Sequence, residues 1–266
     1  MLRHPAVASQ FYPGDPETLR RTLASLIPET SKQKALAVVS PHAGYIYSGS
    51  VAGRTMARVA VPKTCIVLGP NHHGRGAEAA LMASGAWRMP LGDVPVNQQV
   101  ARSILANSAV IKEDNAAHEY EHSLEVQVPF LQYLQPDLTI VPLCLSYLSY
   151  EDCKEIGTAL ARTVSEFEEK ILLVASTDMS HYESRQSASI KDKMALDRIL
   201  DLDPEGLYNT VIGNRISMCG IIPTTITLIA ALRLGCQQAE LVRYTDSGEA
   251  SGDTTQVVGY AGLILS

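Results

Sequence analysis

The chain has 266 residues, 46% of them hydrophobic, and a formal net charge of −6 at pH 7. This length and apolar content are enough for a full core in one large domain or in two closely joined ones. The acidic balance, without any block of Lys or Arg, argues against a nucleic-acid or anionic-membrane partner, and no apolar run approaches the roughly 20 residues of a bilayer span.

The cysteines are odd in number, widely spaced and free of any CxxC pair. This usage does not suit a disulfide framework and predicts a reducing, cytoplasmic setting. The five positions are Cys65, Cys144, Cys153, Cys219 and Cys236.

The first half of the chain alternates between strand-like and helical patterns. It begins with an irregular arm that ends near Asp15. In chain order, the pattern then predicts a helix at 16–27, a strand at 36–40, a helix at 50–60, strands at 64–69 and 77–84, and a helix at 97–105.

The second half continues the alternation without a repeat or an interdomain linker. It predicts a helix at 117–135, a strand at 138–145, a helix at 151–168, a strand at 171–176, helices at 185–201, 204–212 and 222–234, and strands at 239–246 and 256–265. A glycine-rich segment, 247–256, is expected to connect the last two strands. Strands and helices in this order predict a single α/β domain over residues 1–266.

Three of the expected strands end in polar turns that carry histidine. The turns place His42 after 36–40, His72 and His73 after 64–69, and Asp178 and His181 after 171–176. If these strands are parallel neighbours, their carboxyl ends meet at one edge of the sheet. A single histidine in a turn is usually there for ordinary hydrogen bonding, but three junctions together favour a metal or catalytic site.

The segment His118-Glu119-Tyr120-Glu121-His122 fits the H-E-x-x-H pattern of helical zinc proteases. In that pattern two histidines share one helix face and the glutamate activates water. A zinc hydrolase is therefore an alternative hypothesis. Pro129 interrupts the expected helix soon afterwards, and so short a pattern also arises by chance.

Cys219 differs from the other cysteines because it lies in a break between two expected helices, in the sequence Ser217-Met218-Cys219-Gly220. A thiolate in such a break can reach a site. Taken alone, a cysteine here is more often a buried free thiol.

Several motifs together resemble the Memo protein family over residues 3–264. They are RHPAVASQFYP, PHAGYIYSG, LGPNHHG, EHSLEVQVPFLQ, STDMSHY, MCG and YTDSGEASGDTTQVVGYAG, in this order. Prokaryotic members of that family are often labelled as protein B of the AmmeMemoRadiSam system. The resemblance therefore implies a functional link to an AMMECR-type protein and a radical-SAM enzyme.

The resemblance also implies a fold similar to that of class III extradiol dioxygenases, an α/β/α arrangement around a mostly parallel or mixed sheet. It implies that His42, His72 and Cys219 bind a metal ion, and that Asp178 and His181 are catalytic. Four further residues are expected to line the pocket: Phe11, Tyr47, His73 and His122. The family's EHSxE motif matches Glu121 to Glu125 and leaves His118 outside, which counts against the zinc hydrolase.

Imidazole and thiolate ligands suit iron, copper or zinc. The resulting hypothesis is a mononuclear site, with Fe(II) as the expected metal and Cu or Zn as alternatives, in a metal-dependent oxidoreductase. His181, positioned by Asp178, would be the acid/base. The substrate is an unidentified small molecule or peptide.

Two other functions stay open. One is a non-catalytic protein that binds a peptide or partner over a vestigial site. The other is a metal-independent enzyme in which Cys219 is a nucleophile activated by His181.

Overall fold

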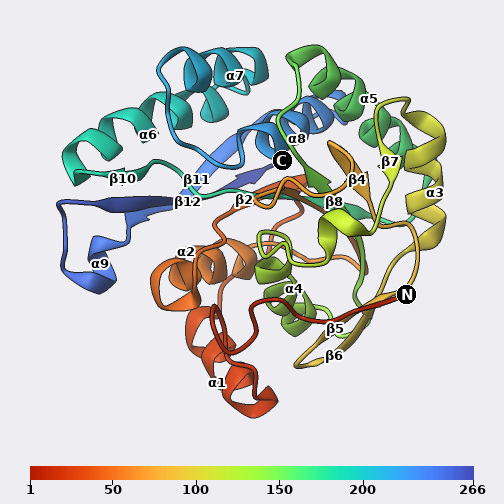
Figure 1. Cartoon of the computed structure of the whole chain (residues 1–266), viewed down its shortest axis with the longest axis horizontal. Coiled ribbons are helices and arrows are strands. Elements are labelled where there is room, and N and C mark those ends of the chain that lie inside the picture. The colour runs from red at the N-terminus through yellow and green to blue at the C-terminus, as the bar shows by residue number, and fades with distance from the viewer.

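A computed structural model describes residues 1–266 and has a nine-stranded mixed sheet at its centre (Figure 1). The strand order is β10-β12-β2-β9-β3-β8-β4-β7, and β11 also pairs with β12. The strands of this sheet are β2 (Ala37–Ser40), β3 (Thr64–Pro70), β4 (Ala79–Leu81), β7 (Lys112–Glu113), β8 (Thr139–Leu145), β9 (Ile171–Ser176), β10 (His181–Glu183), β11 (Ala239–Asp246) and β12 (Val257–Leu265).

The four middle strands, β2, β9, β3 and β8, run parallel to one another. Every residue of β2, β3 and β9 is buried. Strands covered on both faces read as nearly continuous apolar runs, which is the pattern their sequences show. Because the three are parallel neighbours, the turns that follow them meet at one edge of the sheet.

Helices cover both faces of the sheet (Figure 1). One layer contains α3 (Gln98–Asn107), α5 (Tyr150–Glu166), α6 (Arg185–Leu200), α7 (Pro204–Gly213) and α8 (Ile221–Arg233). The other contains α1 (Pro16–Leu26), α2 (Tyr45–Ala57) and α4 (Val128–Leu134). The α/β fold predicted from the sequence is thus confirmed, with helices on both sides of a mixed sheet.

A small second sheet carries the amino-terminal arm. It consists of β1 (Leu2–Arg3), β5 (Ala86–Met89) and β6 (Gly92–Pro95), with β1 parallel to β5. The hairpin of β5 and β6 was not among the predicted elements. Its two strands have only four residues each, too few for a clear alternating pattern.

Helix α2 begins at Tyr45, five residues before the predicted start at 50. Gly44 is its N-cap, and the Tyr45 hydroxyl donates to the carbonyl of Val126. The turn between β2 and α2 therefore contains only four residues, 41–44. His42 lies in this turn, between two rigid elements.

The predicted helix at 117–135 is wrong over residues 117–127, and only its second part corresponds to a helix, α4. The structure has two short 3-10 turns there, Ala116–His118 and Glu125–Gln127, before α4 begins at Val128. Arg3 donates to the carbonyls of His118 and Glu121. Those carbonyls would accept from backbone N–H groups in a helix, so a side chain from far away in the chain replaces the helical pattern.

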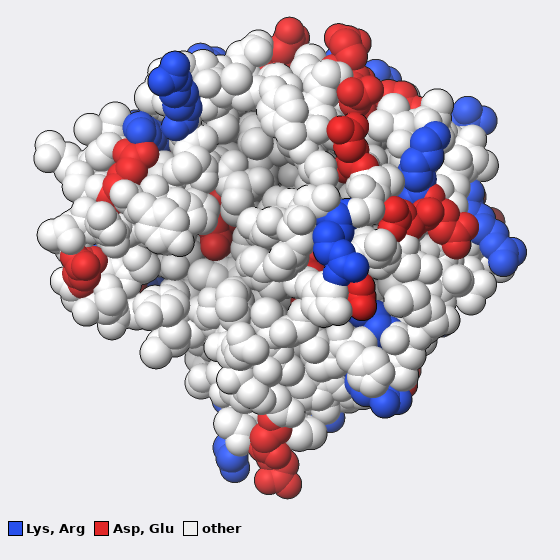
Figure 2. All heavy atoms as spheres, in the orientation of Figure 1, with Lys and Arg blue, Asp and Glu red and all other residues white.

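The segment 247–256 joins the antiparallel strands β11 and β12, as predicted, and contains the short helix α9 (Gly248–Ser251). None of the helices has both the length and the apolar composition needed to cross a bilayer. Figure 2 shows positive and negative side chains interspersed over one face of the molecule, without a continuous basic patch.

Candidate metal-binding site

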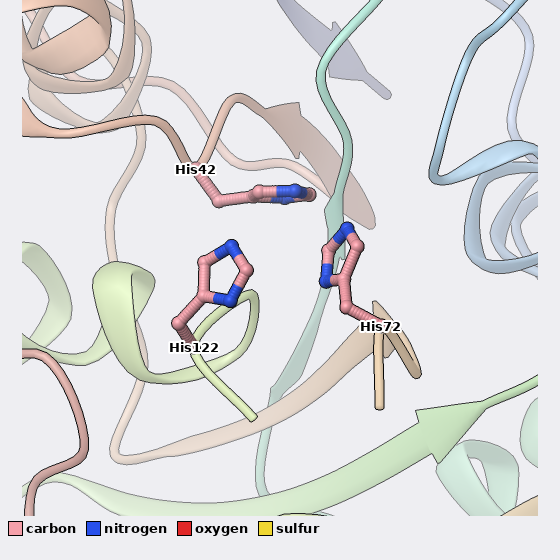
Figure 3. Close-up of side chains that lie close together, drawn as sticks. All are labelled: His42, His72 and His122. Carbon is pink, nitrogen blue, oxygen red and sulfur yellow. The ribbon is translucent and has the colours of Figure 1, made fainter. Parts of the chain in front are cut away.

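Three imidazole rings lie together at the carboxyl edge of the parallel strands (Figure 3). His42 follows β2, His72 follows β3, and His122 lies in the loop before the second 3-10 turn. One ring nitrogen from each lies within 4.8 Å of the other two. The ring centroids are 4.6 Å apart for His72 and His122, and 5.3 Å apart for His42 and His72.

The tautomer of His42 follows from its hydrogen bonds. Its Nδ1 lies 3.0 Å from the hydroxyl of Ser176. That hydroxyl donates its only proton to the carbonyl of Ser123, at 2.7 Å, so it can only accept from His42. The Nδ1 atom of His42 therefore carries the proton, and its Nε2 presents a lone pair.

Gln127 holds the Ser176 hydroxyl and the turn that carries His42 in place. Its amide nitrogen donates to the Ser176 hydroxyl at 2.8 Å and to the carbonyl of Pro41 at 2.9 Å. Gln127, Ser176 and His42 are all buried. A metal ligand whose other ring nitrogen is held in this way has its ring orientation fixed before any ion arrives.

His72 is held in the same tautomer by Glu121. The Nδ1 atom of His72 lies 2.9 Å from Glu121 Oε1, and the backbone N–H of His72 donates to Oε2 at 2.6 Å. A carboxylate only accepts, so Nδ1 of His72 carries the proton and Nε2 is free to bind a metal. The side chain of Glu121 is buried, whereas that of His72 is 31% exposed.

Glu121 is ionised at neutral pH. Burial alone would raise the pKa of this carboxyl, but the hydrogen bonds from His72 and from the backbone N–H of Ser123 outweigh it and hold the pKa at about 2. In the sequence, only its place in the EHSxE motif points to Glu121. Glu121 was not among the site residues predicted from the sequence.

Nδ1 of His122 lies 3.5 Å from Glu121 Oε1, and the ring packs against Phe11 with centroids 4.9 Å apart. Burial lowers the pKa of His122 to about 4 and that of His42 well below its ordinary value. Both rings are therefore neutral at pH 7 and can offer a lone pair to a metal.

Cys219 reaches the site from the break before α8. Its Sγ lies 3.3 Å from Nε2 of His42 and accepts the backbone N–H of Asp178 at 3.3 Å. Burial, with the nearby negative charge of Asp178, raises the pKa of this thiol well above its usual range. Without a metal ion Cys219 therefore keeps its proton, for which two acceptors lie within reach: Nε2 of His42 at 3.3 Å and the carbonyl of Asp178 at 3.6 Å.

The close approach of Cys219 depends on Gly220. A Cβ atom at position 220 would overlap the side chain of Thr177 and the carbonyl of Ser176. We expect Gly220→Ala to destabilise the fold by about 1–3 kcal/mol through overpacking and to move Cys219 away from His42. Urea unfolding measures the first effect.

Gly213→Ala is the matched control, because nothing lies within 4 Å of a Cβ placed at this helical position. It should leave stability equal to or slightly above that of the wild type. Equal loss in both variants would show that the tight contact at position 220 is not the cause.

Asp178 and His181 do not hydrogen-bond each other. Asp178 Oδ1 accepts the backbone N–H of His42 at 2.8 Å, and burial raises its pKa to about 6. The Nδ1 atom of His181 donates to the carbonyl of Ser217 at 2.8 Å. The hydrogen bond that orients the ring of His181 is thus to Ser217, whereas Asp178 anchors the turn that carries His42.

The remaining expected pocket residues lie nearer the surface. Tyr47 is in the first turn of α2 and is 42% exposed. His73 is exposed and lies beside Glu121 and His122. Tyr182, which follows His181 and was not an expected pocket residue, is 75% exposed and has a positive φ of 57°, a conformation that is uncommon for residues other than glycine.

The H-E-x-x-H segment does not form the zinc-protease arrangement. His118 is buried, its Nε2 donates to the carbonyl of Ala80, and its ring lies against Trp87. Glu119 instead pairs with Arg75 at the surface. Because residues 119–124 are not helical, His118 and His122 do not share a helix face, and the hypothesis of a zinc hydrolase built on His118, Glu119 and His122 is wrong.

These observations define a class of protein: a single α/β domain with several imidazoles and one thiol at the carboxyl edge of its parallel strands. The family model described as "Memo-like protein" matches residues 3–264. The chain therefore belongs to the Memo-like family, as its motifs predicted.

Similar proteins agree over the whole length. A MEMO1 family protein of Methanopyrus kandleri is 40% identical over 280 residues, covering 100% of this chain and 99% of that protein. A MEMO1 family protein of Methanothermobacter thermautotrophicus is 38% identical, and the match covers 99% of this chain and 100% of that protein. The crystal structure of an uncharacterised Escherichia coli K12 protein matches 87% of this chain and 100% of its own, with a TM-score of 0.55 and 18% identity, which supports the fold.

Proposed function

We propose that this chain binds one transition-metal ion through His42, His72 and Cys219, and that it is a metal-dependent oxidoreductase with iron as its metal. The observation that carries the proposal is the Nε2 lone pair of His42. It faces Cys219 Sγ at 3.3 Å, and the ring of His42 contributes one nitrogen to the group of three imidazole nitrogens within 4.8 Å of one another.

The donor set fits such an ion. Two imidazoles with Nε2 free and one thiol combine nitrogen ligands with a soft sulfur ligand, a set that binds iron, copper or zinc. His122 lies within reach as a further nitrogen. When bound, a redox-capable ion would supply electron transfer to or from a substrate, which none of these side chains provides alone.

The surrounding residues have separate tasks in this proposal. Ser176 and Glu121 hold the tautomers of His42 and His72. His181, whose Nδ1 proton is held by Ser217, offers its Nε2 lone pair to take a proton from a bound molecule. Burial of His42 keeps water away from one side of the site.

Peptide or partner binding is a second candidate because an open groove lies beside the site. The groove has a volume of about 530 Å³, and its lining includes Phe11, Tyr12, Tyr45 and the exposed Ile46. Phe11 also touches His122. A chain that binds a peptide here, and turns over no small molecule with metal present, would favour this candidate.

The metal proposal is tested by elemental analysis of protein purified without oxygen and passed through gel filtration. We expect the wild type to retain about one ion per chain, and His42→Ala and Cys219→Ser to retain far less, because each loses one of three ligands. His4→Ala, which removes an exposed imidazole from the amino-terminal arm, is the control.

A second measurement follows the thiol proton. Because Cys219 carries a proton in the metal-free state, binding of an ion by its thiolate should release one proton, which a pH indicator detects. Cys219→Ser should release none. Equal metal content in the wild type and both ligand variants would overturn the proposal.

A further inference from the structure

A second group of metal-ligating side chains lies beside the imidazoles of the proposed metal site. It consists of His73, Glu121 and His122, and one ligand atom from each lies within 4.8 Å of the other two. We call it the outer group, and the set His42, His72 and His122 the inner group. His73 is exposed, whereas His42 is 2% exposed. The two groups, which share His122, thus lead from the surface to the buried histidine.

Each member of the outer group has an unused lone pair. Glu121 Oε1 accepts from Nδ1 of His72 and from the backbone N–H of Ser123, but Oε2 accepts only from the backbone N–H of His72. The ring of His73 makes no hydrogen bond within the protein, and Nδ1 of His122 lies 3.5 Å from Glu121 Oε1. An ion bound through Oε2 of Glu121 would therefore leave the hydrogen bonds of Oε1 in place.

We propose that the outer group is a loading site, where a divalent first-row metal ion binds before it moves to His42 and His72. The proposal rests on the metal site of the proposed function. Two imidazoles with one carboxylate are a common ligand set for such ions. The negative charge of Glu121 attracts a hydrated cation, and the exposed ring of His73 is the first ligand that the cation meets.

His122 gives the transfer its route. His122 belongs to both groups, so the outer and the inner position have one ligand residue in common while His73 and Glu121 are exchanged for His42 and His72. The metal keeps its oxidation state, and each exchange replaces one coordinate bond by another. Cys219 then binds as a thiolate and releases its proton to solvent, which favours the inner position.

Loading kinetics test the proposal. Metal-free protein is mixed with Co²⁺, and the visible absorption of the bound ion is followed in time. His73→Ala should load about tenfold more slowly, because the site that concentrates the ion is lost. Its equilibrium affinity should equal that of the wild type, because His73 is not an inner ligand. His4→Ala should load at the wild-type rate.

A second variant isolates the outer site. His42→Ala should bind one Co²⁺ ion weakly, without the thiolate-to-cobalt charge-transfer band that Cys219 gives in the wild type. The double variant His42→Ala/His73→Ala should lose this weak binding as well. The weak ion should also be removed by gel filtration, since His73 is exposed to solvent.

The outcomes separate this proposal from the one on which it rests. If the wild type binds Co²⁺ tightly but His73→Ala loads equally fast, the loading site is refuted and the inner site stands. Failure of His42→Ala to bind any ion refutes the outer site directly. If the wild type itself binds no ion, the proposed function fails.

Discussion

Replacing Glu121 by glutamine is expected to lower the affinity of the chain for its metal ion by about 10- to 100-fold. Glu121 accepts three N–H groups, two from His72 and one from Ser123. Glutamine has one acceptor oxygen, and its NH₂ group would face one of these donors. The ring of His72 therefore loses its anchor, and titration with Co²⁺ by calorimetry measures the loss.

Glu119→Gln is the matched control. Glu119 is two residues away, is about half exposed and pairs with Arg75, so its replacement should leave metal affinity unchanged. A further readout uses metal-free protein: ¹⁵N shifts of the His72 ring should report the Nδ1–H tautomer in the wild type and a mixture in Glu121→Gln. A single unchanged tautomer in the variant would contradict the role of Glu121.

Replacing Arg3 by methionine is expected to reduce the free energy of unfolding by about 3–5 kcal/mol. Arg3 and Glu125 form an ion pair at 2.8 Å, with side chains only 2% and 0% exposed. Glu125 also accepts from the backbone N–H groups of Ala6 and Val7 and from the hydroxyl of Tyr12. Without Arg3 its charge is buried with no cation beside it.

Urea unfolding of Arg3→Met and of the control Arg75→Met measures this difference. Arg75 pairs with Glu119, and both side chains are about half exposed, so this pair is worth at most about 1 kcal/mol. If both variants lose a similar, small free energy of unfolding, burial does not make the Arg3–Glu125 ion pair more important for stability than the exposed pair.

The loss of Arg3 should also change the position of the loop that carries His122. Arg3 holds the carbonyls of His118 and Glu121, and the arm that follows carries Phe11 to its contact with His122. The loop of His122 is thus held by the amino-terminal arm. No pattern within residues 117–135 indicates this, which is why a helix was predicted there.

The parallel strands were predictable because their apolar runs are local and continuous. The strand predicted at 171–176 matches β9 residue for residue, and those at 36–40 and 64–69 differ from β2 and β3 by one residue each. The helix predicted at 117–135 is wrong over residues 117–127 for the opposite reason. Partners far away in the chain hold this part: Arg3 donates to the carbonyl of His118, and the hydroxyl of Ser123 donates to the carbonyl of Pro70.

Some residues of the candidate site could also be recognised from the sequence, and others could not. The turns carrying His42, His72 and Asp178 could be recognised from the sequence, because each follows a strand whose buried character is plain. Ser176 could not be recognised as the partner of His42, because it reads as the end of an apolar strand. Its function as a hydrogen-bond acceptor appears only when β2 and β9 lie side by side.

The sequence by itself determined the family, the α/β class and the set of histidines at the ends of three strands, because periodicity and motifs are properties of neighbouring residues. Only the tertiary structure decided which ring nitrogen of His42 and of His72 is free, that His122 joins them, and that Glu121 accepts from Nδ1 of His72. These features depend on hydrogen bonds between residues far apart in the chain, such as that from His42 to Ser176, 134 positions away. The Nε2 lone pair of a histidine is available for a metal only when an acceptor such as Ser176 or Glu121 holds the proton on Nδ1.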